Sequence, residues 1–326
     1  GSHNIITNSY IERVGNIAHT GHGISVKASG RKSEFNLIQN SQVKNIGQAV
    51  QLRHTEVKYN VVRNILFTGS KSQGANGVVL RDNTSYNTIE GCTMYKLGMG
   101  VRFADNSSEL GTQMGGHHNK IINSVFNGCD VNIVSSGLDG TAKPSKYNEI
   151  LNCTFYNSLF MFSLKESFGS SNKMINCNIV NVKSKIKRGS ASLKISESYN
   201  NYYNGYSKPS GTGNISKNPS FIGASSNNFR LKKGSPLINK GKNLSQVSSD
   251  FNRISRSSGG SHDIGAFEFS EEGQVLPEPE SPENEDPIVE DTPIQNCDEF
   301  EAWAGKNVRI NIGESVTLKV TGGDTY

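Results

Sequence analysis

Three cationic residues recur at the same place in successive segments of the chain. Lys27, Arg53 and Arg81 each follow the last apolar residue of a short alternating run, in ISVK, VQLR and VVLR. Stacked strands would bring these side chains into one outward column, about 5 Å apart. Like charges so placed repel each other, and an anionic chain lying along the column would relieve that repulsion. The spacing therefore predicts a binding face for a polyanion, or alternatively a solvated basic face with some attraction to Asp82 or Glu56.

Two histidines accompany this column. His22 precedes Lys27 by five residues, and His54 follows Arg53 directly. β-Elimination from a uronate needs a base for the C5 proton, a cation to neutralise the carboxylate, and a proton donor for the leaving oxygen. Lys27 could be the base because neighbouring positive charge disfavours its protonated amine. Arg53 or Arg81 would neutralise the carboxylate, and His54 or His22 would assist proton transfer.

Long insertions extend the same candidate site. Segments 105–118 and 135–147 leave from one corner of the repeat, where such loops commonly build a binding groove. A His-His pair in a Gly-rich loop is only weak support for a metal, and the chain has no Cys-x-x-Cys motif, so no metal site is predicted. We expect four residues to contact substrate: Arg81, Arg102, His117 and His118.

A repeating backbone must hold these residues. An Asn-x-apolar-x-Asn/Gly-small-x-apolar pattern occurs seven times, at intervals of 24 to 32 residues. A constant minimum with a variable excess is typical of a coil of fixed circumference with loops inserted at one corner. Asn at the corners tolerates a left-handed backbone and can hydrogen-bond the Asn above and below. The copies begin at Asn4, Asn36, Asn60, Asn87, Asn119, Asn148 and Asn172.

Each coil also carries a second short strand, whose alternation directs residues such as Val50 and Leu52 inward. The pattern predicts an all-β fold, a right-handed single-stranded parallel β-helix over residues 1–269. An antiparallel sandwich would need hairpin turns and would not keep a fixed Asn phase. Scarce Ala, Leu and Glu exclude a helical bundle, and no run of about 18 apolar residues could span a membrane. The second strands are expected at 23–27, 49–53, 77–81, 100–104 and 130–134.

The rest of the chain divides into three parts. Residues 216–269 resemble the C-terminal tail of many secreted bacterial β-helix proteins, as a last coil and cap. Residues 270–296 are an acidic, Pro-rich linker, and 297–326 resemble the start of an immunoglobulin-like or PKD-type module. The tail contains a group that is either a catalytic cluster or, as we favour, ion pairs that close the end of the helix: Asp250, Arg256, Asp263 and Glu268.

Charge is distributed unevenly along the chain. Residues 1–270 hold 31 Lys and Arg against 15 Asp and Glu, whereas 271–296 hold nine acids and no base. A basic body implies an anionic partner, and we expect a polysaccharide. Nucleic acid is disfavoured because Tyr and Phe do not interleave with the cationic column as a stacking platform. Because the repeat begins in mid-pattern, we expect upstream coils and a signal peptide in a secreted or cell-surface protein, a monomer within a multidomain chain.

Three cysteines share one small inward position of the repeat: Cys92, Cys153 and Cys177. Buried free thiols acting as small hydrophobes are the favoured interpretation. A disulfide between Cys153 and Cys177, on successive coils, is the alternative, and it would need the two side chains to turn toward each other.

The segments ISVKAS (24–29), NLIQNS (36–41), QLRH (51–54) and YNVVRNILF (59–67) are similar to polysaccharide lyase family six, which includes chondroitinase B and alginate lyases. The similarity covers about three coils. It implies a right-handed β-helix, cleavage of a uronate polymer by elimination, and the catalytic Lys and Arg at Lys27 and Arg53. It also implies calcium, but the family's acidic ligands are replaced here by His19-Thr20-Gly21-His22-Gly23. No cofactor is therefore evident.

A weaker similarity links GHGISV (21–26) to polygalacturonase-type glycoside hydrolases. It would place QLR (51–53) near the basic substrate-binding strand of that family. Hydrolysis needs a pair of carboxylates, and residues 1–20 lack the Asp residues that this family carries. A third alternative is a non-catalytic, polysaccharide-binding or adhesive β-helix within a larger surface protein. The cationic column suits a lyase or a binder, and the lyase is favoured.

Overall fold

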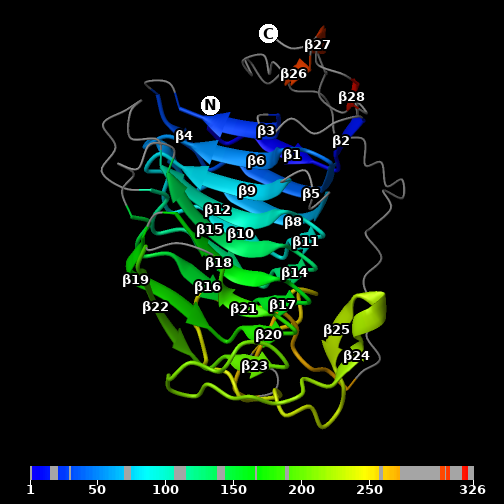
Figure 1. The fold of residues 1–326 in the computed structure, drawn as a ribbon. Helices are drawn as coiled ribbons and strands as arrows, with labels where there is room; N and C mark the ends of the chain where they lie inside the picture. Colours follow the sequence, from blue (N-terminus) through cyan, green and yellow to red (C-terminus); the bar gives the residue numbers. More distant parts are fainter. Residues whose placement is uncertain are drawn as a thin grey trace.

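The computed structural model of the chain is a parallel β-solenoid, as the repeat predicts (Figure 1). Among the described residues the only helical segment is a three-residue 3-10 turn, η2 (Ala224–Ser226). Of residues 302–321 the backbone of three short strands is described. The structure describes residues 2–14, 21–28, 31–69, 75–105, 115–137, 144–165, 167–187, 191–256, 260–271, 302–304, 306–308 and 318–321.

A 15-stranded sheet forms one side of the solenoid, and its strands within the repeat are parallel and in register. The long strands β5 and β8 become pairs of short strands in later coils, because the chain turns between them. Its members are β1 (Ile5–Thr7), β2 (Tyr10–Val14), β5 (Leu37–Lys44), β8 (Val61–Thr68), β10 (Thr88–Glu90), β11 (Thr93–Tyr95), β13 (Lys120–Ile122), β14 (Val125–Asn127), β16 (Glu149–Leu151), β17 (Thr154–Tyr156), β19 (Phe168–Ile175), β20 (Asn178–Val180), β22 (Leu193–Ser198), β23 (Asn201–Tyr203) and β28 (Leu318–Thr321).

A seven-stranded parallel sheet contains the second strand of each coil. Three two-stranded sheets complete the set: β4 (Ser33–Glu34) with β7 (Val57–Lys58), β24 (Phe221–Gly223) with β25 (Asn228–Leu231), and β26 (Ala302–Ala304) with β27 (Lys306–Val308). The seven strands are β3 (His22–Lys27), β6 (Gln48–Arg53), β9 (Asn76–Arg81), β12 (Met99–Asp105), β15 (Val131–Gly137), β18 (Phe160–Leu164) and β21 (Ser184–Ile186).

The first Asn of each repeat builds a continuous hydrogen-bonded ladder, as predicted. Asn60 shows the pattern: its Oδ1 accepts from the backbone N of Asn36 at 2.9 Å and from Nδ2 of Asn36 at 2.7 Å, and Asn60 donates in the same way to Asn87. The same pair of bonds joins every coil from Asn4 to Asn172. Each bond contributes about 1 kcal/mol, so the ladder ties coil to coil along the axis.

The left-handed corner belongs to a different Asn from the one in the ladder. The second Asn of the repeat takes positive φ at Asn40 (50°), Asn64 (49°), Asn123 (50°) and Asn152 (49°), and Gly91 replaces it in one coil (59°). Asn and Gly are the residues that adopt this conformation at least cost. The two asparagines of the pattern therefore have separate roles, one as a hydrogen-bond rung and one as a bend.

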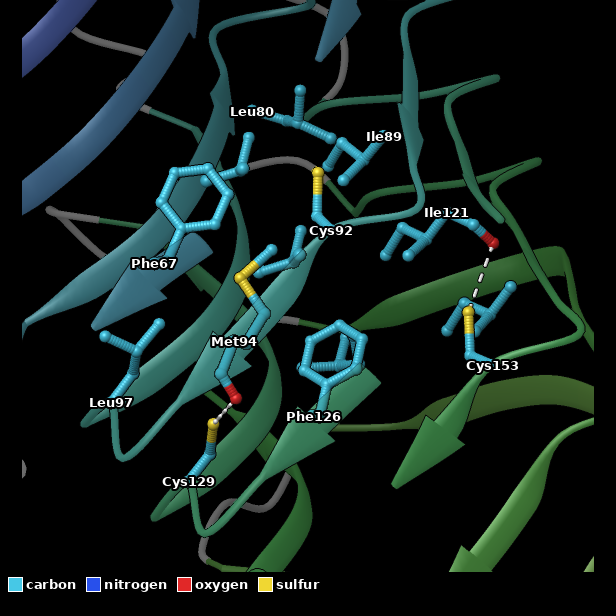
Figure 2. Close-up of a cluster of buried hydrophobic side chains, with 14 of the residues drawn as sticks. Phe67, Leu80, Ile89, Cys92, Met94, Leu97, Ile121, Phe126, Cys129 and Cys153 are labelled. Atoms are coloured by element: carbon cyan, nitrogen blue, oxygen red, sulfur yellow. Dashed lines mark hydrogen bonds between the residues drawn. The ribbon is translucent and has the colours of Figure 1, made fainter. Parts of the chain in front are cut away.

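Aliphatic, aromatic and sulfur-containing side chains fill the interior of the solenoid (Figure 2). Cys92, Cys129, Cys153 and Cys177 are buried free thiols, so the favoured interpretation of the cysteines is confirmed. Burial raises the pKa of the Cys92 thiol to about 12, which keeps it protonated and unreactive. Two thiols donate to backbone carbonyls in Figure 2, Cys129 to Met94 at 3.5 Å and Cys153 to Ile121 at 3.6 Å.

The C-terminal tail lies along the flank of the solenoid. Two of the asparagines with positive φ hold the tail in place. Asn123 Nδ2 donates to the Ser249 carbonyl at 2.6 Å, and Asn176 Nδ2 donates to the Lys242 carbonyl at 2.8 Å. Figure 1 shows β24 and β25 beside the later coils. A small apolar cluster including Val125, Phe229 and Phe267 joins the two parts. We expected a last coil and cap at 216–269, and the tail instead packs alongside the strands from 120 onward.

Beyond residue 271 the sequence expectations are largely untested. Residues 272–296 of the expected linker lie outside the described residues, as does most of 297–326. The described backbone there consists of the antiparallel pair β26–β27 and the strand β28, which pairs in parallel with β2. An immunoglobulin-like or PKD-type module stays a prediction.

Candidate functional site

The cationic column lies on the seven-stranded sheet, at the carboxyl ends of β3, β6 and β9. Lys27 is in register with Arg53, and Arg53 with Arg81. The next two coils place Ala104 and Ser136 at this position, so the column contains three cations. The predicted alignment of Lys27, Arg53 and Arg81 is confirmed. Lys27 is exposed on β3, the edge strand of this sheet.

A buried carboxylate holds the two arginines. Asp82 is wholly buried, and its Oδ2 accepts from Nε of Arg53 at 2.6 Å and from Nε of Arg81 at 3.1 Å. The side chains of Arg53 and Arg81 are only 15% and 13% exposed. The arginines are therefore fixed between the sheet and the Asp82 turn, and the attraction to Asp82 that the solvated-face alternative named is present.

Arg102 lies on the same face, two positions back along β12. It is in register with Val79, and its Nε donates to Ser136 Oγ at 2.7 Å. Burial, and then the charge of Arg81, lower the pKa of Arg102, so the two guanidinium groups lie close enough to repel. Burial also lowers the pKa of Arg81, against the opposing attraction of Asp82. The face thus concentrates positive charge in a poorly solvated setting.

Two imidazoles next to the column can accept a proton. Burial, and then the charges of Lys27, Arg81 and Arg53, lower the pKa of His22, which opens β3. His22 is therefore neutral at neutral pH. His54 follows β6 with φ of 90°, and its Nδ1 lies against the carbonyl oxygen of Ala28. Because a carbonyl only accepts, that nitrogen carries a hydrogen, and in the neutral form of the ring the lone pair is on Nε2.

The structure places His117 and His118 elsewhere. His117 bridges Ser85 at the corner before the 15-stranded sheet, and its Nδ1 lies 2.7 Å from Nδ1 of His118. Burial, and then His118 and Lys58, lower the pKa of His117 to about 4. The described contacts of the two histidines are with these neighbours and with aromatic rings, and not with the cationic column. Their predicted contact with substrate stays a prediction.

An aromatic stack at that corner was not anticipated from the sequence. Neighbouring rings stack with centroids 4.6 to 5.4 Å apart, and every member has φ between 53° and 62°. The signal was present, because an aromatic residue or His immediately precedes six of the seven repeat asparagines. Side chains at one corner position of successive coils must stack. The members are His3, Phe35, Tyr59, Tyr86, His118 and Tyr147.

No group of three or more His, Cys, Asp or Glu within the described ranges is placed to hold a metal ion. Of the stretch expected to hold calcium ligands, residues 19 and 20 lie outside the described residues, and 21–23 contribute no carboxylate. No helix in the part of the chain that the structure describes is long and apolar enough to cross a bilayer. Parts of the two insertions, residues 106–114 and 138–143, also lie outside it, as do Glu109, Asp139 and Lys143.

The tail end of the solenoid contains two surface hollows of about 470 and 400 Å³. Neither is lined by a residue of the cationic column. The column lies instead across successive strands of the seven-stranded sheet. A face that spans several coils fits a long ligand, whereas a hollow fits a small one.

Comparison with known proteins adds little to this geometry. A search of protein-family models and of curated proteins found no match. Among solved structures, the chain is similar to the crystal structure of pectate lyase Pel9A, with 16% sequence identity and a TM-score of 0.33. The similarity covers 82% of this chain and 88% of that one. At this level of similarity, the function has to be argued from the site itself.

Proposed function

We propose that this protein binds an anionic polysaccharide along the seven-stranded sheet and cleaves it at a uronate by β-elimination. The observation that carries the proposal is the in-register column of Lys27, Arg53 and Arg81 on three successive strands of the seven-stranded sheet. Successive coils lie about 4.8 Å apart, comparable to the length of one sugar residue. A polymer lying across the coils can therefore present an anionic group to more than one cation.

The arginines would bind and activate the uronate carboxylate. Loss of the C5 proton sends charge into that carboxylate, so fixed cations stabilise the transition state most. Asp82 holds Arg53 and Arg81 in place before the substrate arrives. Little rearrangement is then needed at the moment of reaction.

Proton transfer would fall to the groups at the Lys27 end of the column. His54, which lies against the Ala28 carbonyl next to Lys27, can take the C5 proton, and the Lys27 ammonium can protonate the leaving oxygen. The sequence favoured the reverse assignment, with Lys27 as the base. His22, at the opposite end of β3, is a further candidate for the base. The electron pair left at C5 forms the C4–C5 double bond as the bond from C4 to the glycosidic oxygen breaks.

The test is the ultraviolet absorbance of the unsaturated uronate, measured with alginate, pectate, chondroitin, dermatan, heparin and ulvan, with and without calcium. We expect a rise with one polymer, and a loss of about 100-fold or more in Lys27→Ala and in His54→Asn. Lys194→Ala, at an exposed strand lysine of the other sheet, is the matched control and should keep full activity. An unimpaired Lys27→Ala enzyme on the cleaved polymer would refute the assignment.

A non-catalytic binding module is the second candidate. The rigid tie of Arg53 and Arg81 to Asp82 favours it, because binding alone needs fixed cations and no proton transfer. It predicts no absorbance rise with any polymer, together with salt-sensitive binding to one of them. Loss of that binding in Arg53→Ala would then assign the column to recognition.

A further inference from the structure

A second binding feature lies on the opposite flank, in the larger hollow of about 470 Å³. One side of the hollow is the outward face of β17, β20 and β23, and the other is the tail around β24 and η2. Ligand pockets in proteins typically enclose about 300–1,000 Å³. The hollow is thus large enough for a small molecule.

Its floor and walls come from one outward column of the 15-stranded sheet. Tyr156, Val180 and Tyr203 are in register on three successive coils. Val180, between the two tyrosines, is only 3% exposed, and the tyrosines bound a notch about two coil spacings long, or about 10 Å. Such a notch accommodates one six-membered ring.

The two tyrosines differ in what they already contact. Tyr156 packs against Phe229, with ring centroids 5.0 Å apart, and against Phe221 at 6.1 Å. Asn127, on the coil before that of Tyr156, holds the β24–β25 hairpin in place by donating to Asn227 Oδ1 at 2.6 Å. Tyr203 is half-buried and has no aromatic neighbour among the described residues. Tyr156 is therefore a fixed wall of the hollow, and the ring of Tyr203 is the one that can contact a ligand.

The polar groups of the notch suit hydroxyls better than charges. Asn204 Nδ2 donates to Asn181 Oδ1 at 2.7 Å, so the pair turns the Asn181 amide N–H groups and the Asn204 carbonyl oxygen to other partners. Asn218 adds a third amide at the rim, and Lys232 is the single charged residue of the lining. Paired amide donors and acceptors next to an aromatic ring match a sugar, whose apolar C–H face stacks on the ring while vicinal hydroxyls at its edge bond to the amides.

The geometry points to a subsite for one pyranose residue, stacked on Tyr203 and hydrogen-bonded to Asn181 and Asn204. It is separate from the cationic column and does not rest on polymer cleavage there. A polyanion is disfavoured because Lys232 is its only cation. The ligand class is a neutral sugar residue at the end or in a branch of a glycan.

The experiment is saturation-transfer NMR and calorimetry on the full chain with methyl glycosides of glucose, galactose and mannose, and with their trisaccharides. We expect saturation transfer to at least one probe. Tyr203→Ala should weaken its binding about tenfold, and Tyr203→Phe should stay within about twofold because the ring remains. Tyr95→Ala is the matched control, since Tyr95 occupies the same outward column on β11 but lies outside the hollow.

Absence of saturation transfer with every probe would overturn the subsite. So would equal losses in the Tyr203→Ala and Tyr95→Ala proteins. Lys27→Ala tests whether the two sites are separate, because it should leave sugar binding in the hollow unchanged. Sugar binding lost in Lys27→Ala and kept in Tyr203→Ala would move the ligand to the cationic column. A nucleoside tested alongside should not bind, and its binding in place of the sugars would refute the assigned ligand class.

Discussion

Two clusters of charged residues both combine arginine with buried carboxylates, but one joins the tail to the solenoid and the other forms the candidate binding face. In the tail, the fully buried Arg256 donates to Glu268 at 2.9 Å, to Asn123 at 2.7 Å and to the Gly265 carbonyl at 3.0 Å. Asp263 and Asp250 there accept from backbone N–H groups. On the cationic face, one buried carboxylate holds two arginines, and Lys27 and Arg102 add further positive charge.

The two clusters differ in their balance of positive and negative charge and in the groups that donate hydrogen bonds to their carboxylates. The tail has three carboxylates around one arginine, and backbone N–H groups satisfy the excess. The cationic face has four cations, Lys27, Arg53, Arg81 and Arg102, against Asp82 and the buried Asp105, whose charge also attracts Arg81. Density of ionisable groups therefore marks the structural joint, whereas an excess of positive charge marks the candidate site.

The largest expected effect is at the tail. Arg256→Ala leaves Glu268 and its neighbours buried without a counter-charge, and it removes the contact with Asn123. We expect a loss of about 3–5 kcal/mol in the free energy of unfolding, measured by urea denaturation. Arg63→Ala, at the partly exposed pair with Glu90 (3.0 Å), is the control and should cost about 0–1 kcal/mol. A loss as small as the control's would show that the cluster does not join tail to solenoid.

The tail should also impose a pH dependence. Burial, and then Arg256, lower the pKa of His262 to about 4. Since this lies below the unfolded value of about 6.5, the stability that the neutral ring contributes is present above pH 6.5 and is lost as the pH falls through 4. His262→Gln should remove this loss, about 2–3 kcal/mol, in unfolding curves measured from pH 7 to pH 4.

Glu268 works in the opposite direction over the same range. Burial, and then Asp263, raise its pKa to about 7. The stability that its protonated form contributes is therefore present below about pH 4.3 and is lost as the pH rises through 7. The difference between wild type and His262→Gln isolates the histidine from this background. An unchanged difference across the range would contradict its assignment.

The next effect tests the hydrogen bonds that join Arg53 and Arg81 to Asp82 on the cationic face. Asp82→Asn keeps the shape but removes the carboxylate to which both arginines donate, so we expect a loss of about 1–3 kcal/mol in unfolding free energy. A bound polyanion should restore stability by mass action. Thermal unfolding with and without dextran sulfate measures this. The same polyanion should not rescue Arg256→Ala, and rescue of both variants would remove the distinction between the two clusters.

The smallest expected effect separates recognition from stability. Arg53→Ala should weaken binding of dextran sulfate about tenfold, measured by calorimetry at low salt, because it removes one cation of the column. Arg63→Ala should stay within about twofold, since Arg63 lies on the other sheet. Equal losses would mean that the polyanion responds to overall charge and not to the column.

The repeat allowed the solenoid, the Asn ladder and the column to be predicted. The observed β6 and β9 begin one residue before the predicted strands and end with them. Local pattern sufficed because each coil repeats the same contacts, so one aligned residue type fixes the register of its neighbours. The alignment of Lys27 with Arg53 and Arg81 follows directly from that register.

Features that depend on non-repeating contacts were out of reach. Asp82 lies 29 residues from Arg53, on a turn whose geometry comes from the fold. The tail docks on Asn123 and Asn176 from 126 and 66 residues away, and no periodicity encodes that path. Tyr203 and Asn181 form a hollow only because the tail lies beside them. Arg102 could be assigned to a strand, but its two-position offset from Arg81 required the observed pairing.

The Asn ladder also has a consequence for how the protein can change length. Asn60 accepts from Asn36 and donates to Asn87 through identical atoms, so each coil presents the same connector at its two surfaces. Excising residues 60–86 would bring Asn36 against Asn87 with no change in the chemistry of the joint. Duplicating the same segment would add one more rung and one more arginine of the column, a copy of Arg81. The solenoid can thus be lengthened or shortened in whole cassettes, and the reach of its cationic face set by counting coils.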